Sequence, residues 1–250
     1  MRAASFILFA ILGVTACSDQ RETAACVSQA FESDLFTVCG FDPHGQVLQL
    51  AWASADGSPY RGFAALARDM PGVRVAFAMN AGMFDLTGAP IGLYLEQAKQ
   101  LHAINTADGP GNFHMKPNGV FWVDTSGAPK VSSTDTFLAL NPAAVWATQS
   151  GPMLVVEGNV HPGFSQDGDS RFVRNGVGIG ADGRAWFVIS DGPVSFGKFA
   201  RFFRDELKSA NALYLDGAVS SLWAPSLKRM DAGSPLGPLV VVTSPSPFPH

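Results

Sequence analysis

The sequence predicts an α+β protein: a single domain with a large, mainly antiparallel or mixed β-sheet core and a few packed helices. Three observations predict it. Many short apolar runs alternate with turn residues, and the 250 residues include 26 Gly and 17 Pro. Only two segments have convincing helical periodicity. No internal repeat and no linker divides the chain.

The composition is that of an ordinary globular protein, with 47% hydrophobic and 15% charged residues and a formal net charge of −4. Because no basic face is evident, nucleic acid is excluded as an expected partner. A small phosphorylated substrate remains compatible with this charge, since one or two well-placed arginines suffice to bind it.

The N-terminus resembles a bacterial lipoprotein signal peptide. Met1-Arg2 is positive, the apolar run from Phe6 to Val14 is too short to span a bilayer, and Thr15-Ala16-Cys17 resembles a lipobox. We therefore expect a signal peptide at 1–16, lipidation of Cys17 and a lipid anchor at the bacterial envelope. Ser18 fits the outer membrane or its periplasmic face if the host is Gram-negative. The alternative is an ordinary secretory signal with a chance cysteine.

Beyond Cys17, the expected organisation is a polar tether at 17–33, one domain at 34–244 and a Pro-rich tail at 245–250. Two further cysteines remain, Cys26 and Cys39. An even number of cysteines in an oxidising compartment suggests a disulfide. Two unpaired buried thiols are the alternative.

Apolar patterns predict the elements in order. A Pro-His-Gly turn separates the first two strands, Pro71-Gly72 stops the first helix, and Asp182-Gly183 indicates a two-strand hairpin. Ser195 is a plausible N-cap for the second helix. The strands are expected at 35–39, 47–52, 73–79, 91–95, 119–124, 153–156, 175–180, 185–190, 212–215 and 238–243, with helices at 60–70 and 196–209.

The common catalytic motifs are absent. The sequence has no Gly-x-Ser-x-Gly elbow, P-loop, His-Glu-x-x-His or Cys-x-x-Cys. Its five histidines lack metal-ligand spacing, which disfavours a zinc hydrolase. No cofactor and no metal are expected.

Polar residues next to glycines follow several apolar strands, where buried strands end in loops that can converge on a ligand. Four such places carry the site prediction: Asn80 with Gly82, Ser150-Gly151-Pro152, Arg174 before Gly176, and Asp216-Gly217 before Ser220-Ser221. Each has a simpler explanation. Asn80 suits a left-handed or Asx turn, the glycine pairs suit ordinary turns, and Arg174 could pair with a surface carboxylate such as Asp169.

Taken together and in order, these segments resemble the phosphodiester glycosidase family, the relatives of the mannose-6-phosphate "uncovering" enzyme. The likeness runs from about Val73 to Val242. It rests on Asn80-Ala81-Gly82-Met83-Phe84, Gly111 to Phe121, Ser150 to Val155, Arg174 to Ile179, Asp191-Gly192, and Leu215 to Ser221. Ala81, Asn175-Gly176 and Ala218 depart from the family pattern. Ala218 matters most, because a glycine needed there for positive φ or close substrate approach would be lost.

The resemblance implies hydrolysis of a sugar-1-phosphodiester between the anomeric carbon and oxygen, with a phosphorylated glycan or similar diester, such as an N-acetylglucosamine-1-phosphodiester, as substrate. Arg174 would stabilise the leaving phosphate. Asp216, or as second choice Asp191, would face the developing oxocarbenium ion. The expected substrate-binding residues are Asn80, Gly82, Asn118, Ser150, Gly151, Gly217 and Ser220. Trp122 and Trp223 could stack on a sugar, although a core position is at least as compatible with each.

Two other functions remain open. One is a non-catalytic lipoprotein that binds glycans or wall polymers in the same cleft. The other is a metal-dependent phosphodiesterase that uses Asp216, Asp191 and asparagines as oxygen ligands of a hard cation.

Overall fold

A computed structural model describes residues 25–245 of the chain. The expected signal peptide, Cys17, the first part of the tether and residues 246–250 of the tail lie outside the described residues. Within residues 25–245, no helix is long and apolar enough to cross a membrane.

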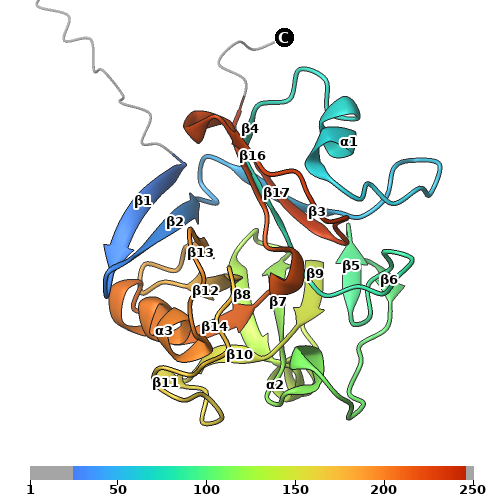
Figure 1. The fold of residues 1–250 in the computed structure, drawn as a ribbon. Coiled ribbons are helices and arrows are strands. Elements are labelled where there is room, and N and C mark those ends of the chain that lie inside the picture. Colours follow the sequence, from blue (N-terminus) through green and yellow to red (C-terminus); the bar gives the residue numbers. More distant parts are fainter. Residues whose placement is uncertain (1–24, 246–250) are drawn as a thin grey trace, which may run out of the picture.

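Three antiparallel sheets form the domain (Figure 1). The first sheet has the order β1 (Cys26–Phe31), β2 (Asp34–Phe41), β13 (Ala185–Ser190), β12 (Asn175–Ile179), β14 (Asn211–Tyr214), β10 (Met153–Val156), β11 (Asn159–Val160). The second has the order β16 (Arg229–Met230), β15 (Leu222–Ala224), β4 (Val75–Asn80), β17 (Leu239–Thr243), β3 (Val47–Ala51). The third has the order β6 (Lys99–His102), β5 (Tyr94–Glu96), β9 (Ala144–Ser150), β7 (Gly119–Asp124), β8 (Pro129–Ser133).

The three sheets meet around Phe187 in the main core. Its ring centroid lies 5.5 Å from that of Phe77 in the second sheet and 5.4 Å from that of Phe121 in the third. All three side chains are buried. Alternation along each strand sends these residues to the common interior, so each sheet covers one side of a single core.

Helices are few and short. They are α1 (Phe63–Arg68), α2 (Thr134–Leu140) and α3 (Phe196–Arg201), and α3 continues as a π turn over Phe202–Glu206. The Ser195 side chain caps α3 by accepting from Lys198 N. Phe199, Phe202 and Phe203 pack with Phe36 in a second cluster, and Figure 1 shows α3 and the second sheet on opposite sides of the first. The predicted fold class, an α+β domain that is mainly antiparallel, is confirmed.

The details differ from expectation at several elements. The tether predicted up to residue 33 gives way to strand β1 at Cys26, which places residues 26–33 inside the domain. Cys26 lies opposite Cys39 on β2, and their sulfurs form a disulfide. Both predicted helices are shorter than expected, and α2 and β9 were not predicted.

The segment Leu215–Ser221 crosses from the first sheet to the second. It follows β14 and leads into β15, which pairs with β4. Its middle forms a 3-10 turn over Gly217–Val219. We call this segment the crossover loop, and it carries Asp216.

Candidate active site

The crossover loop is anchored to both sheets through its backbone. Leu215 N donates to the Asn175 carbonyl at 3.1 Å, and Asp216 N donates to the Ala81 carbonyl at 2.9 Å. The ends of β12 and β4 therefore fix the position of Asp216 from two sides. Such attachment holds a loop residue with the precision of the strands beside it.

Two buried asparagines stabilise the same loop. Asn80 donates through Nδ2 to the Asp216 carbonyl at 2.6 Å, and its Oδ1 accepts from Ser221 N at 2.8 Å and from Asn175 Nδ2 at 3.0 Å. The Asn175 Oδ1 in turn accepts from the Ser220 hydroxyl at 3.1 Å. Asn80 and Asn175 are both buried. The network thus supports the loop from its buried side, and Asn175, which stands where the family pattern has threonine, takes part in three of its hydrogen bonds.

The Asp216 carboxyl is nearly buried, with 9% of the residue exposed. Burial raises its pKa to about 6, against the smaller opposing effect of the Ala218 backbone N–H, which donates to Oδ1 at 3.2 Å. A carboxyl group with a pKa near neutrality can serve in proton transfer or change its charge over the working pH range.

Gly217 is required by close packing. A Cβ built on it would lie 1.7 Å from the Tyr214 hydroxyl oxygen. Ala218, by contrast, is exposed and lies inside a 3-10 turn, a backbone conformation open to any L-residue. The alanine that replaces a family glycine therefore causes no backbone strain.

Arg174 directly precedes β12 and is almost completely buried, with 1% exposure. Its Nε donates to the Val194 carbonyl at 2.9 Å, Nη2 donates to the Ser170 carbonyl at 2.8 Å, and Nη1 donates to the Tyr214 hydroxyl at 3.2 Å. The guanidinium also stacks on Phe196, with Cζ 3.6 Å from the ring centroid. These partners, rather than Asp169, surround the charge.

Tyr214 lies close to both Arg174 and Asp216, the two residues that are the first choices for catalysis from the sequence. Its hydroxyl accepts from Arg174 and packs against Gly217, next to Asp216. Among the hydrogen bonds of the described residues, this hydroxyl takes part only in the one that it accepts from Arg174. Burial raises the pKa of Tyr214 and Arg174 opposes that shift, while Asp216 adds to it. Arg174 and Asp216 thus share a neighbour instead of forming a direct pair.

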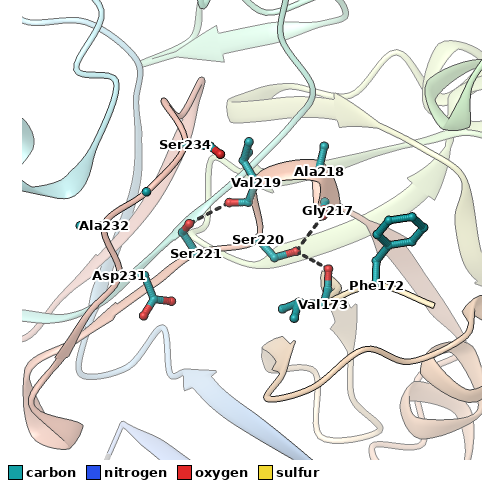
Figure 2. A pocket seen from close by; sticks show the side chains of 11 residues that line it. Phe172, Val173, Gly217, Ala218, Val219, Ser220, Ser221, Asp231, Ala232 and Ser234 are labelled. Atoms are coloured by element: carbon teal, nitrogen blue, oxygen red, sulfur yellow. Dashed lines mark hydrogen bonds between the residues drawn. The ribbon is translucent and has the colours of Figure 1, made fainter.

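A pocket of about 360 Å³ opens on the outer side of the crossover loop (Figure 2). Gly217 to Ser221 form its middle, Phe172-Val173 one wall, and Asp231 to Ser234 the other. Figure 2 shows the Ser220 hydroxyl hydrogen-bonded to the Gly217 and Val173 carbonyls, and that of Ser221 to the Val219 carbonyl. Of the predicted residues, Gly217 and Ser220 line the pocket. Asp216 and Arg174 are not among the lining residues, but each is next to one in the sequence.

Asp191, the second candidate carboxylate, lies in a different group. It accepts from the Thr37 hydroxyl at 2.9 Å and contacts Arg229 Nη1 at 3.4 Å. Arg229 also forms an ion pair with Asp231 at 2.8 Å. Within residues 25–245, no group of three or more His, Cys, Asp or Glu side chains could hold a metal ion.

Three other predicted residues form a packed corner beside the third sheet. Asn118 Nδ2 donates to the Phe113 carbonyl at 3.0 Å, and its Oδ1 accepts from the Thr134 hydroxyl at 2.8 Å. A Cβ on Gly151 would lie 2.7 Å from that of Asn118. The hydroxyl of Ser150 is buried, and it has no hydrogen-bond partner in the described structure.

The remaining predicted positions serve packing in this structure. Gly82 lies so close to β9 that a Cβ would meet the Thr148 hydroxyl at 2.4 Å. Trp122 is buried and packs edge-on against Phe137, and Trp223 packs near Phe63. Sequence reasoning missed Tyr214, Phe172 and Asp231. The position of Tyr214 two residues before Asp216 was the available signal for the first, but its apolar neighbours indicated only a strand.

The chain matches the model of the phosphodiester glycosidase family over residues 73–238. It belongs to that family.

Among proteins of known sequence, it is 35% identical over 185 residues to the Escherichia coli (strain K12) protein named "Uncharacterized protein YigE". This match covers 73% of this chain and 71% of the relative. Among solved structures, it is similar to the catalytic domain of zebrafish N-acetylglucosamine-1-phosphodiester alpha-N-acetylglucosaminidase auto-inhibited by its pro-peptide. The TM-score is 0.62 at 15% identity, over 88% of this chain and 82% of that one. A hypothetical protein from Synechocystis matches with a TM-score of 0.56 at 17% identity, over 88% and 61%. At these identities the structural matches show the fold.

Proposed function

We propose that the protein hydrolyses a glycosyl phosphodiester, with Asp216 as the carboxylate that faces the anomeric carbon. One observation carries the proposal: a nearly buried carboxyl with a pKa of about 6 lies on the loop that borders the pocket, in a chain of the phosphodiester glycosidase family. Backbone hydrogen bonds to the ends of two strands, together with two buried asparagines, hold that loop in place.

The reaction places modest demands on the protein. Water attacks the anomeric carbon, the bond from that carbon to the phosphate oxygen breaks, and a free sugar and a phosphate monoester leave. Because the phosphate monoester is a good leaving group, little proton donation is needed. The ionised Asp216 would stabilise the positive charge that develops on the sugar ring. Activity would therefore rise with pH through about 6.

Arg174 supports the phosphate side through Tyr214. The guanidinium polarises the phenolic O–H from 3.2 Å and remains charged at any working pH. The uncommitted phenolic hydrogen, next to Gly217, would then donate to a phosphate oxygen beside Asp216. In this proposal Arg174 is a positioning residue, whose own N–H groups hold Val194 and Ser170.

The test is an assay of the purified protein with an α-N-acetylglucosamine-1-phosphodiester in ¹⁸O-labelled water. Label in the sugar product indicates cleavage at the anomeric carbon, whereas label in the phosphate indicates a phosphodiesterase. Asp216→Asn should lower kcat about a hundredfold or more. The matched change Asp182→Asn, at the exposed turn between β12 and β13, should leave kcat unchanged. Equal rates in all three proteins would remove Asp216 from the mechanism.

A non-catalytic glycan-binding role is the second candidate. It is favoured by the burial of Arg174, whose three guanidinium nitrogens each already donate within the protein, and by the lack of Lys, Arg or His among the described residues that line the pocket. Saturable sugar binding without product would support it over hydrolysis.

We also propose that the protein is exported and anchored to the bacterial envelope through a lipid on Cys17. The Cys26–Cys39 disulfide supports an oxidising compartment. In cells, the full chain should fractionate with membranes and Cys17→Ala should not. Membrane association of the Cys17→Ala protein would refute the anchor.

A further inference from the structure

Phe172 is unusual because it is both fixed and exposed. The ring lies on the pocket wall with 59% of the residue exposed to solvent. Its backbone pairs with Val194 through two hydrogen bonds of 3.3 and 2.9 Å, and its ring lies over the Arg174 guanidinium, 5.6 Å from Cζ. A large apolar ring on a hydrogen-bonded backbone at a pocket wall offers a stacking surface.

Of the four polar side chains that residues 25–245 contribute to the pocket lining, those of Ser220, Ser221 and Asp231 present acceptors, and the Ser234 hydroxyl can donate or accept. The hydroxyl hydrogens of Ser220 and Ser221 already donate to main-chain carbonyls, so their oxygens are left to accept. Asp231, on the opposite wall, carries a carboxylate that accepts from Leu222 N at 2.9 Å and from Arg229. A carboxylate has further lone pairs available. A ligand that fits this lining supplies hydroxyl or N–H donors.

Charge excludes phosphate from the same space. Among the lining residues in the described part of the chain, the one charged side chain is that of Asp231, whose carboxylate pairs with Arg229 outside the lining. An anionic ligand there would meet a net negative charge and acceptor oxygens, both unfavourable. An uncharged ring with several hydroxyl groups meets neither obstacle.

We infer that this pocket is the binding site for the sugar ring, with Phe172 stacking on its apolar face and Asp231 accepting from its hydroxyl groups. The orientation of the sugar in this site rests on the proposed function. The anomeric carbon would point toward Asp216, and the phosphate would leave on the side of Tyr214 and Arg174. Phe172 and Asp231 are then specificity-determining residues, and the binding energy they supply is independent of the chemical step.

Binding can be measured without turnover. Backbone amide shifts of Ala218, Ala232 and Ser234 in the ¹⁵N-labelled protein would be followed by NMR during titration with a panel of N-acetylhexosamines and hexoses, and separately with inorganic phosphate. We expect saturable shifts with at least one sugar in the wild type and in Asp216→Asn. Phe172→Ala should weaken that binding about tenfold, and Phe172→Tyr should restore it. Leu140→Ala, a comparable truncation of an exposed apolar residue on α2, is the control and should change nothing.

The outcomes separate the two proposals. Sugar binding that depends on Phe172, in a protein without turnover, would keep this inference and reject hydrolysis. Absence of shifts across the sugar panel, unchanged binding in Phe172→Ala, or phosphate shifting the pocket amides in a Phe172-dependent manner would overturn the inference, whatever the activity.

Discussion

The Asn80 side chain donates to the main-chain carbonyl of Asp216 at 2.6 Å, which ties the end of β4 to the crossover loop. The end of β4, in the second sheet, thereby positions the carboxyl of Asp216, which follows β14 of the first sheet. The function proposed for Asp216 depends on this link, because the loop has to hold a buried, partly charged group in place.

Asn80→Ala should destabilise the fold as well as the site. The substitution leaves Ser221 N–H without its acceptor, and it removes the shorter of the two hydrogen bonds to the Asp216 carbonyl and one of the two acceptors of the Asn175 amide. We expect a loss of about 1–3 kcal/mol in the free energy of unfolding, measured by urea denaturation. Asn159→Ala, which removes an exposed side-chain hydrogen bond to the Glu157 carbonyl, should cost less than about 0.5 kcal/mol. Similar losses in both variants would show that the network contributes little.

Asp216→Asn should make the protein more stable at neutral pH. The folded pKa of about 6 exceeds the ordinary value of 3.8, so the folded state binds the proton more tightly than the unfolded chain. Stability therefore falls as pH rises from about 4 to about 6, and a cost of about 3 kcal/mol remains at pH 7. Removing the charge removes that cost.

Urea denaturation at two pH values checks this sign. Asp216→Asn should exceed the wild type in stability at pH 7.5 and match it below about pH 3, where the carboxyl is protonated in both states. A variant that is less stable than the wild type at pH 7.5 would mean that the charged form is well solvated in the fold.

Gly217→Ala should disrupt the loop, whereas Ala218→Gly should not improve it. The new Cβ would overlap the Tyr214 hydroxyl oxygen, so the loop or the ring must shift, at a cost of about 1–3 kcal/mol and with loss of activity. Ala218 needs no glycine, so its replacement should leave kcat within about twofold. Gly45→Ala, where a Cβ would meet no heavy atom within 4 Å, is the control. Thermal melts and kcat of the three variants decide the matter.

Sequence patterns predicted the elements whose apolar character is strong and local. Val75–Asn80 is an almost continuous apolar run, and Asp182-Gly183 marks the turn between β12 and β13. Strands β1 and β9 were missed because Cys26–Phe31 and Ala144–Ser150 mix polar and apolar residues without clear alternation. Their strand conformation comes from pairing with β2, β5 and β7, which are tertiary contacts.

The sequence predicted several residues that come together at the candidate site, but not the hydrogen bonds and contacts that join them. Asp216, Gly217, Asn80 and Ser220 converge on one loop, as their position at strand ends suggested. The environment of Arg174 could not be predicted, because main-chain carbonyls of Val194 and Ser170 accept from it and carbonyls have no sequence signature. The proximity of Tyr214 to Gly217 likewise depends on the path of the folded loop.

Tyr214→Phe separates the catalytic contribution of the Arg174 environment from its structural one. Arg174→Ala would remove a donor from the Val194 and Ser170 carbonyls and leave a cavity where a large buried side chain was, so its inactivity would not distinguish misfolding from lost chemistry. Tyr214→Phe keeps the ring and removes only the hydroxyl. If that hydroxyl donates to the leaving phosphate, kcat should fall about tenfold or more while KM changes little, because the interaction strengthens as charge develops. Tyr94→Phe removes another buried phenol hydroxyl, which bonds Glu96, and should lower stability without changing kcat. A Tyr214→Phe enzyme with wild-type kcat would confine the Arg174–Tyr214 pair to a structural role.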